Sequence, residues 1–166
     1  MIVHARKAIL QGLTPKENRE IPPLRYDVVR RLKEDFPDMP VALNGGLRTA
    51  EACVEALEWA DGVMLGREAY HRPMVLGELY AALEPESYRP LTVAEHLERR
   101  AVYAEREMTR GERLPAITRH LLGLVSHVPG AREYRRLLSE GARAPGAGPE
   151  LLRQAARLCE GEVGQG

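Results

Sequence analysis

Two glycine-containing motifs, each at the end of an apolar segment, are the residues of this chain best suited to bind a ligand. The motif residues are Asn44, Gly45, Gly46, Gly66 and Arg67. Glycines allow the backbone to approach an anion closely and to direct N–H groups at it. An arginine adds a planar guanidinium that binds phosphate through two donors. The pair of motifs therefore predicts a phosphate site, although the glycines could be turn residues and Arg67 a solvated charge.

Further side chains that could take part in binding lie near these motifs or in later helices. His4 ends the first apolar segment, where it could hydrogen-bond a ring cofactor, act as an acid, or simply pack. Lys16 and Arg19 are three residues apart in a proline-rich loop, and Arg132 and Arg135 have the same spacing in a predicted helix. Each basic pair could contact phosphates of a polyanion, and Arg132 and Arg135 share one face of their predicted helix. Exposed charges of this kind are also often only solvated.

The sequence contains no constellation typical of metal or nucleophilic catalysis. Its five histidines are scattered, without a second ligand at helical spacing, and His120 beside Arg119 is predicted to be a helix-surface pair. Cys53 and Cys159 lie in helical apolar patterns and form neither a disulfide framework nor a zinc motif. We predict two buried free thiols and no metal site.

Composition limits the class of protein further. The 24 basic and 24 acidic residues balance, so total charge favours neither nucleic acid nor a membrane surface. No apolar run approaches the roughly 20 residues that span a bilayer, and the N-terminus has no secretory signal pattern. We therefore predict a cytoplasmic protein without membrane segments.

The first half of the chain has the pattern of a parallel sheet covered by helices. Apolar segments at 1–3, 41–43 and 63–65 read as buried strands. Between them we predict a proline-rich loop at 9–24 and a helix at 26–36 with Val28, Val29, Leu32 and Phe36 on one apolar face. A second helix begins at Thr49, its N-cap. We assign residues 1–85 to this α/β part.

The second half is predicted to be an all-α bundle of about four helices at residues 91–166. Before it, Pro73 is expected to begin a helix that runs to Leu83. Within the bundle, Thr92 and Glu95 form a capping box, and Pro115 begins a helix that carries apolar residues through 125. We predict a break at Pro129–Gly130, then helices at 132–139 and from 149. Positions 91–160 hold 12 basic and 9 acidic residues, a net charge of +3.

Several segments taken together resemble one enzyme family. They are 4–8 (HARKA), 13–24 (LTPKENREIPPL), 44–46 (NGG), 62–70 (GVMLGREAY), 117–120 (ITRH) and 129–136 (PGAREYRR). The chain resembles the tRNA-dihydrouridine synthases, and within them the DusA subfamily. The resemblance implies an FMN-binding (β/α)₈ barrel followed by a helical tRNA-binding domain. It also implies that NADPH reduces FMN and that reduced FMN transfers hydride to a uridine extruded from the tRNA D-loop.

The resemblance also implies roles for the residues named above. His4 would contact the flavin. The FMN phosphate would be held by Asn44, Gly45, Gly46, Gly66 and Arg67. Contacts with tRNA would come from Lys16, Arg19, Arg132 and Arg135.

The chain departs from the family pattern at the catalytic cysteine, which lies in an Asn-x-x-x-Cys-Pro-type loop. Neither Cys53 nor Cys159 has that context, so we expect no catalytic residue here. The chain resembles strands six to eight of a barrel plus the helical domain. We expect this piece to be a monomer and, in isolation, inactive and poorly folded. Two alternatives are another FMN-dependent barrel oxidoreductase acting on a free pyrimidine or dihydroorotate, and a non-catalytic RNA-binding fragment.

Overall fold

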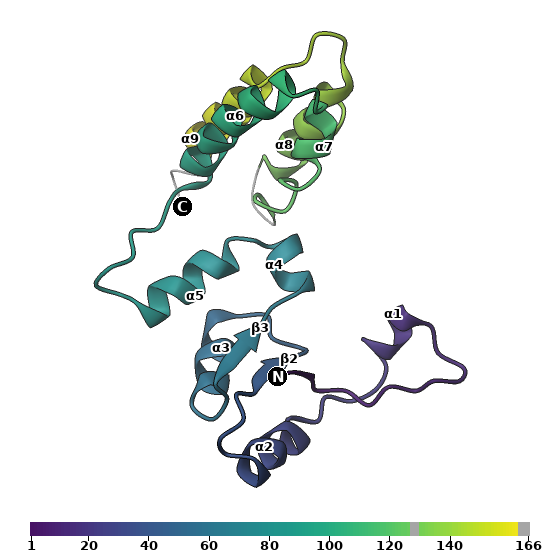
Figure 1. The fold of residues 1–166 in the computed structure, drawn as a ribbon. Coiled ribbons are helices and arrows are strands. Elements are labelled where there is room, and N and C mark those ends of the chain that lie inside the picture. Colours follow the sequence, from purple (N-terminus) through teal and green to yellow (C-terminus); the bar gives the residue numbers. More distant parts are fainter. Residues whose placement is uncertain (127–129, 163–166) are drawn as a thin grey trace. The chain divides into compact units, whose positions relative to one another are not determined.

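The computed structural model describes residues 1–126 and 130–162, which divide into two compact units (Figure 1). The first, called here the strand unit, comprises Met1–Ala69 and Glu78–Tyr88. The second, called the helical unit, comprises Tyr70–Gly77 and the described residues from Arg89 onward. Residues 70–77 therefore group with the helices, although the expected boundary between domains lay at residues 85–91.

The strand unit contains a three-stranded parallel sheet in the order β1-β2-β3. Its strands are β1 (Ile2–His4), β2 (Ala42–Asn44) and β3 (Gly62–Met64). Helix α2 (Tyr26–Asp35) lies between β1 and β2 in the chain, and α3 (Ala50–Leu57) lies between β2 and β3. Parallel neighbours require such crossovers, and the predicted parallel sheet with intervening helices is confirmed.

Local signals explain where α3 begins and which face it buries. The Thr49 hydroxyl accepts a hydrogen bond from the backbone N–H of Ala52 (3.2 Å), as an N-cap should. The small residues of α3 pack against the sheet because they let helix and strands approach closely. The buried core of the strand unit consists of Ala5, Val29, Val41, Leu43, Leu47, Ala50, Cys53, Ala56, Ala60 and Leu79.

Asp61 joins the starts of two neighbouring strands. Its carboxylate accepts hydrogen bonds from the Val41 backbone N–H (2.7 Å) and from Lys33 Nζ (2.9 Å). Its own N–H donates to the Val41 carbonyl (2.9 Å). The hydrogen bond from Val41 and then the Lys33 ammonium lower the pKa of the Asp61 carboxyl group. These contacts align β2 and β3 at the edge of the sheet opposite the glycine motifs.

The predicted apolar face of α2 is only partly buried. Val29 is 1% exposed, whereas Val28 and Phe36 are 51% and 56% exposed. Ile2 on β1 is also 62% exposed. The elements packed on α2 within the strand unit therefore cover Val29 and leave Val28 and Phe36, on the predicted apolar face, largely exposed.

The loop at 9–24 contains a short helix, α1 (Pro15–Asn18), which the sequence prediction missed. Thr14 and Glu17 form a capping box, in which each side chain bonds the other residue's backbone N–H. Pro15 fits because the first turn of a helix needs no N–H from that position. The prediction of an irregular loop is corrected for this turn.

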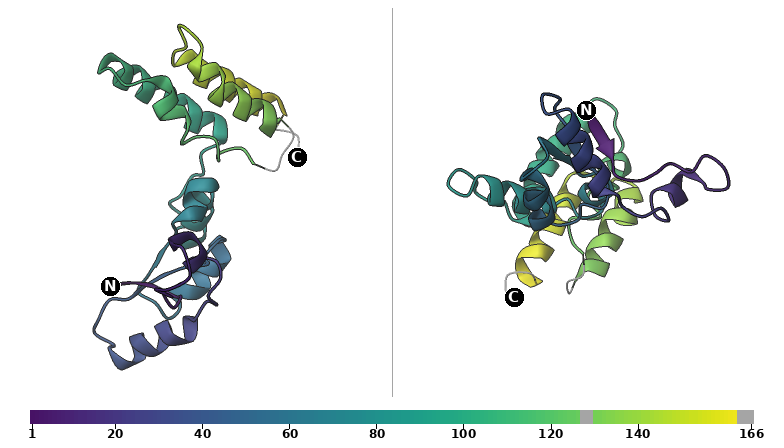
Figure 2. Two further views of the ribbon diagram at one scale, coloured as in Figure 1. Left: turned by 90° about the vertical axis from the view of Figure 1, so that its right-hand side faces the viewer. Right: turned by 90° about the horizontal axis from the view of Figure 1, so that it is seen from below.

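The helical unit is built on α6 (Val93–Thr109) and α9 (Glu150–Glu162), which pack side by side (Figure 2). Its other helices are α7 (Leu114–Thr118), α8 (Ala131–Ser139) and the 3₁₀ turn η1 (Gly141–Arg143). The buried core consists of Ala94, Leu97, Ala101, Ala104, Leu114, Ile117, Leu121, Val125, Ala131, Tyr134, Leu138, Ala142, Leu152, Ala155, Ala156 and Cys159. Among the described residues of this unit every regular element is helical, in agreement with the predicted all-α arrangement.

Two predicted helices differ from the observed ones. The helix expected from Pro115 through residue 125 ends at Thr118, and residues 119–125 form turns that still bury Leu121 and Val125. The expected helix from Pro73 begins instead at Val75 as α5 (Val75–Leu83), preceded by α4 (Arg67–His71). The break predicted at Pro129 lies outside the described residues.

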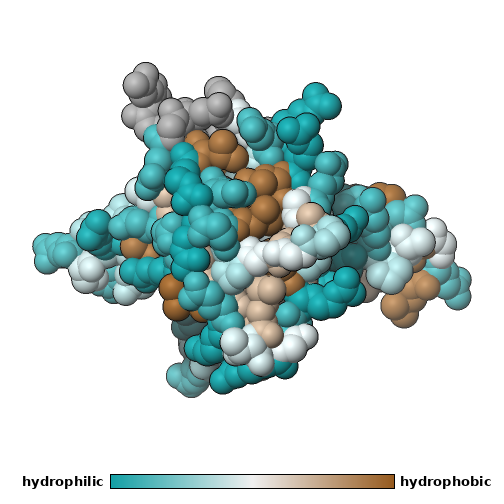
Figure 3. All heavy atoms as spheres, turned by 90° about the horizontal axis from the view of Figure 1, so that it is seen from above, coloured by the Kyte–Doolittle hydropathy of each residue, from teal (hydrophilic) through white to brown (hydrophobic). Residues whose placement is uncertain are grey.

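Two observations concern the polarity of the surface and of the helices. Figure 3 shows a face on which hydrophilic side chains predominate and hydrophobic ones form small separate groups. Among the helices of the described ranges, none is both long enough and apolar enough to cross a bilayer.

Candidate phosphate site and basic loop

Side chains at the carboxyl ends of the three strands form a row across the edge of the sheet. His4, Asn44 and Met64 are register partners in the parallel ladder. His4 Nδ1 lies 3.3 Å from Asn44 Oδ1, and the Asn44 amide nitrogen contacts the Met64 sulfur. Since the amide oxygen can only accept, His4 Nδ1 carries the proton in this pair. The structure therefore brings two of the predicted site residues into direct contact.

Gly45 and Gly46 follow this row and turn the chain with φ values of +112° and +75°. Side chains are disfavoured in this region of φ. A Cβ atom at Gly46 would also lie 2.4 Å from Leu24 Cδ1. The Tyr26 hydroxyl donates to the Gly45 carbonyl (2.7 Å), and burial raises the pKa of Tyr26. The shape of the glycine turn is thus held by residues at the start of α2.

The backbone donors of the glycine motifs are left unpaired by the protein. Within the described residues, the N–H groups of Gly45, Gly46 and Gly66 donate to no protein group. A Cβ atom at Gly66 would meet no atom within 4 Å, so the space beside it is open. Unpaired N–H groups at strand ends suit an anion. The arrangement fits the predicted phosphate site in its chemistry.

Arg67 contacts the proline-rich loop. Its Nη1 lies 2.9 Å from Glu20 Oε1, and its Nη2 donates to the Arg19 carbonyl (3.2 Å). The Arg67 side chain is half-exposed, so this ion pair contributes little stability by itself. The contact places Arg67, a residue predicted to bind phosphate, beside the loop predicted to bind RNA.

Hydrogen bonds hold the loop in an ordered shape. Arg6 and Leu24 form a bridge at its base, and the Arg6 guanidinium donates to the carbonyls of Glu20 and Pro22. Further along, Asn18 accepts from the Ile9 N–H (2.7 Å) and donates to the Ile9 carbonyl (2.9 Å). The Asn18 side-chain amide therefore pairs with both backbone groups of Ile9, as a neighbouring strand would.

The four basic residues expected to contact RNA are all exposed. Lys16 lies in α1, and Arg19 follows that helix directly. Arg132 and Arg135 lie on the exposed face of α8, whose other face buries Ala131, Tyr134 and Leu138 in the helical unit. Exposed guanidinium and ammonium groups can reach phosphates without a cost of desolvating a buried charge.

Both cysteines are buried, as predicted, and they form no disulfide with each other. Cys53 lies in α3, where burial raises the pKa of its thiol, and Cys159 lies in α9 in the helical unit. Neither residue is part of a strand end. Across residues 1–126 and 130–162, no group of three or more His, Cys, Asp or Glu side chains is arranged to hold a metal ion.

Sequence reasoning missed five residues that shape this region. Met64 lies in the middle of the strand predicted at 63–65, and its place at the end of β3, in register with Asn44, follows only from the pairing of the strands. The Thr14–Glu17 capping box has a readable spacing. Glu20 and Tyr26 carried no local signal, since their partners, Arg67 and Gly45, are distant in the sequence.

Comparison with known proteins gives one consistent result. The family profile described as dihydrouridine synthase (Dus) matches residues 1–160. A tRNA-dihydrouridine(20/20a) synthase from Xanthomonas campestris is 51% identical over 98% of this chain and 48% of its own length. Proteins of that name from Xanthomonas axonopodis and Pseudomonas aeruginosa are 53% and 48% identical, over 93% and 96% of this chain and 46% and 48% of their own lengths. The chain spans about half the length of these curated relatives.

Proposed function

Because this chain belongs to the dihydrouridine synthase family, we propose that it supplies the flavin-phosphate site and part of the tRNA-binding surface of a tRNA-dihydrouridine synthase. The observation that carries the proposal is the strand-end row of His4 and Asn44, followed by the Gly45–Gly46 turn. The strands and helices of the strand unit would then be part of a (β/α)₈ barrel, in which ligand sites lie at the carboxyl ends of the strands.

The residues present suit FMN at this site. The unpaired N–H groups of the glycine motifs and the Arg67 guanidinium would hold its phosphate, and His4 would contact its ring system. When bound and reduced by NADPH, FMN would supply the hydride for reduction of a uridine to 5,6-dihydrouridine, and the accompanying proton would come from an acid outside this chain. Asn44 fixes the orientation of His4 through the 3.3 Å contact between Oδ1 and Nδ1.

The tRNA would be held by exposed basic residues on both units. Lys16 and Arg19 are presented by the ordered loop, and Arg132 and Arg135 by α8. A uridine inside folded tRNA must leave its stack before it can react. Phosphate contacts position the RNA for that step without reading its sequence.

We assign no catalytic acid to this chain. Both cysteines are buried in helices, and neither has the Asn-x-x-x-Cys-Pro context of the family. The 166-residue polypeptide is therefore expected not to form dihydrouridine when it is incubated with FMN, NADPH and unmodified tRNA. Product formation above a no-protein control would contradict this assignment.

FMN titration of the purified chain tests the phosphate site directly. We expect Arg67→Ala to raise the Kd for FMN about tenfold or more, because a charge-assisted contact with phosphate is lost. The Kd is measured from the quenching of FMN fluorescence. Arg31→Ala is the matched control, since Arg31 pairs with Asp35 (3.0 Å) on the surface of α2. Equal FMN binding by the wild type and Arg67→Ala would remove Arg67 from the site.

A non-catalytic RNA-binding role is the second candidate. The helical unit has its own buried core and an excess of positive charge over positions 91–160. Salt-dependent tRNA binding without any bound flavin, lost when Arg132 and Arg135 are both replaced by Ala, would favour this role over the first.

A further inference from the structure

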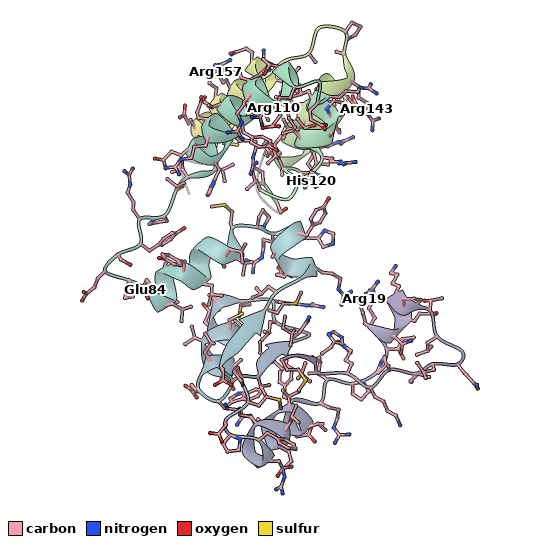
Figure 4. All side chains as sticks on the ribbon, in the orientation of Figure 1. Arg19, Glu84, Arg110, His120, Arg143 and Arg157 are labelled. Atoms are coloured by element: carbon pink, nitrogen blue, oxygen red, sulfur yellow. The ribbon has the colours of Figure 1, made fainter. Side chains whose placement is uncertain are left out.

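A cluster of ring side chains in the helical unit lies outside the strand-end site. The Tyr70 ring meets the His71 ring at 5.6 Å and 81°, and the His120 ring at 5.9 Å and 80°. Both contacts are edge-to-face, the geometry that aromatic pairs prefer. Tyr70 is 54% exposed. His120, labelled in Figure 4, is also exposed and comes from the turns after α7.

A close backbone contact keeps the two halves of the cluster together. A Cβ atom at Gly123 would lie 2.3 Å from the His71 carbonyl oxygen, so only glycine allows this approach. A hydrogen bond from helix α8 holds the turn that carries Gly123. The buried Tyr134 hydroxyl donates to the Leu121 carbonyl (2.8 Å). Burial raises the pKa of Tyr134, which keeps this donor protonated.

Hydrogen bonds in the cluster leave donors that point to no protein group. Arg119 Nε donates to His120 Nε2 (3.1 Å), so the His120 proton is on Nδ1, 3.3 Å from the Tyr70 oxygen. The Tyr70 O–H then has no acceptor in the described part of the chain. The same holds there for the terminal nitrogens of Arg119.

The cluster surrounds a hollow of about 340 Å³, within the size of small-ligand sites, which is roughly 300–1,000 Å³. The hollow is lined by Tyr70, His71, Arg119, His120, Leu122, Gly123 and Ser126. None of these described residues is acidic. A neighbouring hollow shares Arg119 and His120 but is lined by Glu112 as well. The first hollow is therefore the better one for an anionic ligand with a flat ring.

We propose that this hollow binds one unpaired nucleotide of RNA. Its base would pack against the Tyr70 and His71 rings and accept a hydrogen bond from the Tyr70 O–H, and its phosphate would contact Arg119. Base stacking on aromatic side chains and arginine contacts are the common means of holding single-stranded RNA. The proposal rests on the proposed function for the identity of the RNA, and adds a contact that is separate from Arg132 and Arg135.

Titration of the full chain with an unmodified tRNA transcript at several salt concentrations tests the proposal. We expect Tyr70→Ala to weaken binding about tenfold without changing the salt dependence, because a stacked base is lost. Tyr70→Phe keeps the ring and should weaken binding about threefold, as expected for one lost hydrogen bond. Arg119→Ala should weaken binding and also lower the slope of log K against log salt by about 0.7, as expected for one phosphate.

Arg143→Ala is the matched control, because Arg143 is an exposed arginine of the same unit, in η1 (Figure 4). It should leave tRNA affinity within about twofold, the effect of one distant charge. Far-UV circular dichroism verifies that each variant is folded. Short oligouridylate should compete with tRNA for the wild type, and this competition should weaken in Tyr70→Ala.

The proposal is overturned if the wild type binds no tRNA, if Tyr70→Ala and Arg119→Ala bind like the wild type, or if Arg143→Ala loses as much as Arg119→Ala. The proposed function is judged by a separate measurement, the titration with FMN. Loss of tRNA binding in Tyr70→Ala with no FMN binding by any variant would support the nucleotide site while contradicting the flavin site.

Discussion

The helical unit and the strand unit differ in how completely they bury their apolar side chains. In the helical unit, α6, α7, α8 and α9 enclose a core that includes fully buried Leu97 and Leu152. In the strand unit, Ile2, Val28 and Phe36 are each more than half exposed. The sheet also pairs only internally, so that within the described residues β1 and β3 each have one unpaired side.

This difference indicates which part can be stable by itself. Burial of apolar area is the main favourable term in folding, at about 25 cal/mol per Å². The helical unit obtains that burial from its own helices. The strand unit exposes apolar side chains, and burying them against another surface would stabilise it. Trp59, the only tryptophan of the chain, lies in the strand unit, so its fluorescence follows that unit. Helical circular dichroism follows the helices of both units, and a circular dichroism transition without a matching change in Trp59 fluorescence therefore reports the helical unit.

Leu97→Ala should have the largest effect and should separate the two units. Leu97 is fully buried, and its truncation should lower the free energy of unfolding of the helical unit by about 2–5 kcal/mol. The circular dichroism transition should move and the Trp59 transition should not. Val102→Ala is the control, since Val102 lies on the same helix and is 60% exposed. A matching shift of the Trp59 signal would mean that the units unfold together.

Thr92→Ala should have an intermediate effect, again on the helical unit. Thr92 caps α6 by accepting from the Glu95 N–H (3.1 Å), and losing an N-cap costs about 1 kcal/mol. Thr14→Ala removes the same type of cap from α1 and should leave both unfolding transitions unchanged, because α1 buries no residue. Thr92→Ser should restore the circular dichroism midpoint. If Thr14→Ala lowered stability as much as Thr92→Ala, the expected difference between the caps of α1 and α6 would be contradicted.

Asp61→Asn should change the pH dependence of the strand unit alone. The pKa of Asp61 is lowered in the folded state, first by the Val41 hydrogen bond. Its stabilising contribution is therefore complete above the unfolded pKa of about 3.9 and is lost as pH falls through the lower folded pKa. The Trp59 midpoint of the wild type should fall in this acidic range, and the Asp61→Asn variant should lack this part of the fall. Asp38→Asn, an exposed position in the same unit, should behave like the wild type.

Phe36→Ser should have the smallest effect, although a phenyl ring is removed. Phe36 is 56% exposed, so the Trp59 transition should stay within about 0.5 kcal/mol of the wild type. Val29→Ser is the comparison variant, because Val29 lies on the same helix and is 1% exposed. It should clearly lower the midpoint of the Trp59 transition. A large loss in Phe36→Ser would show that the phenyl ring is covered in solution.

Elements with local signals could be predicted from the sequence. Helices α3 and α6 begin at their capping threonines, and the parallel strands follow from short apolar runs between helices. The end of α7 at Thr118 could not be predicted, since the leucines that follow have helical spacing but lie in turns. Exposure of Phe36 was also beyond reach, because periodicity indicates an apolar face without indicating what covers it.

The candidate site was predictable in part for a similar reason. Asn44, Gly45 and Gly46 form a contiguous motif after a strand, and the parallel ladder aligns Asn44 with His4. The pairing of Arg67 with Glu20 joins residues far apart in the sequence, as does the contact of Tyr70 with His120. Such contacts depend on the tertiary fold, and no spacing rule within one segment indicates them.

The pairing of α6 with α9 has a consequence for synthesis of the chain. These helices pack against each other although α7, α8 and η1 lie between them in the sequence. A nascent chain that has left the ribosome only as far as η1 exposes the side of α6 that α9 will cover. Because domains fold as units once their parts are present, the helical unit can close only after α9 has emerged. Until then, this apolar stripe is available to chaperones.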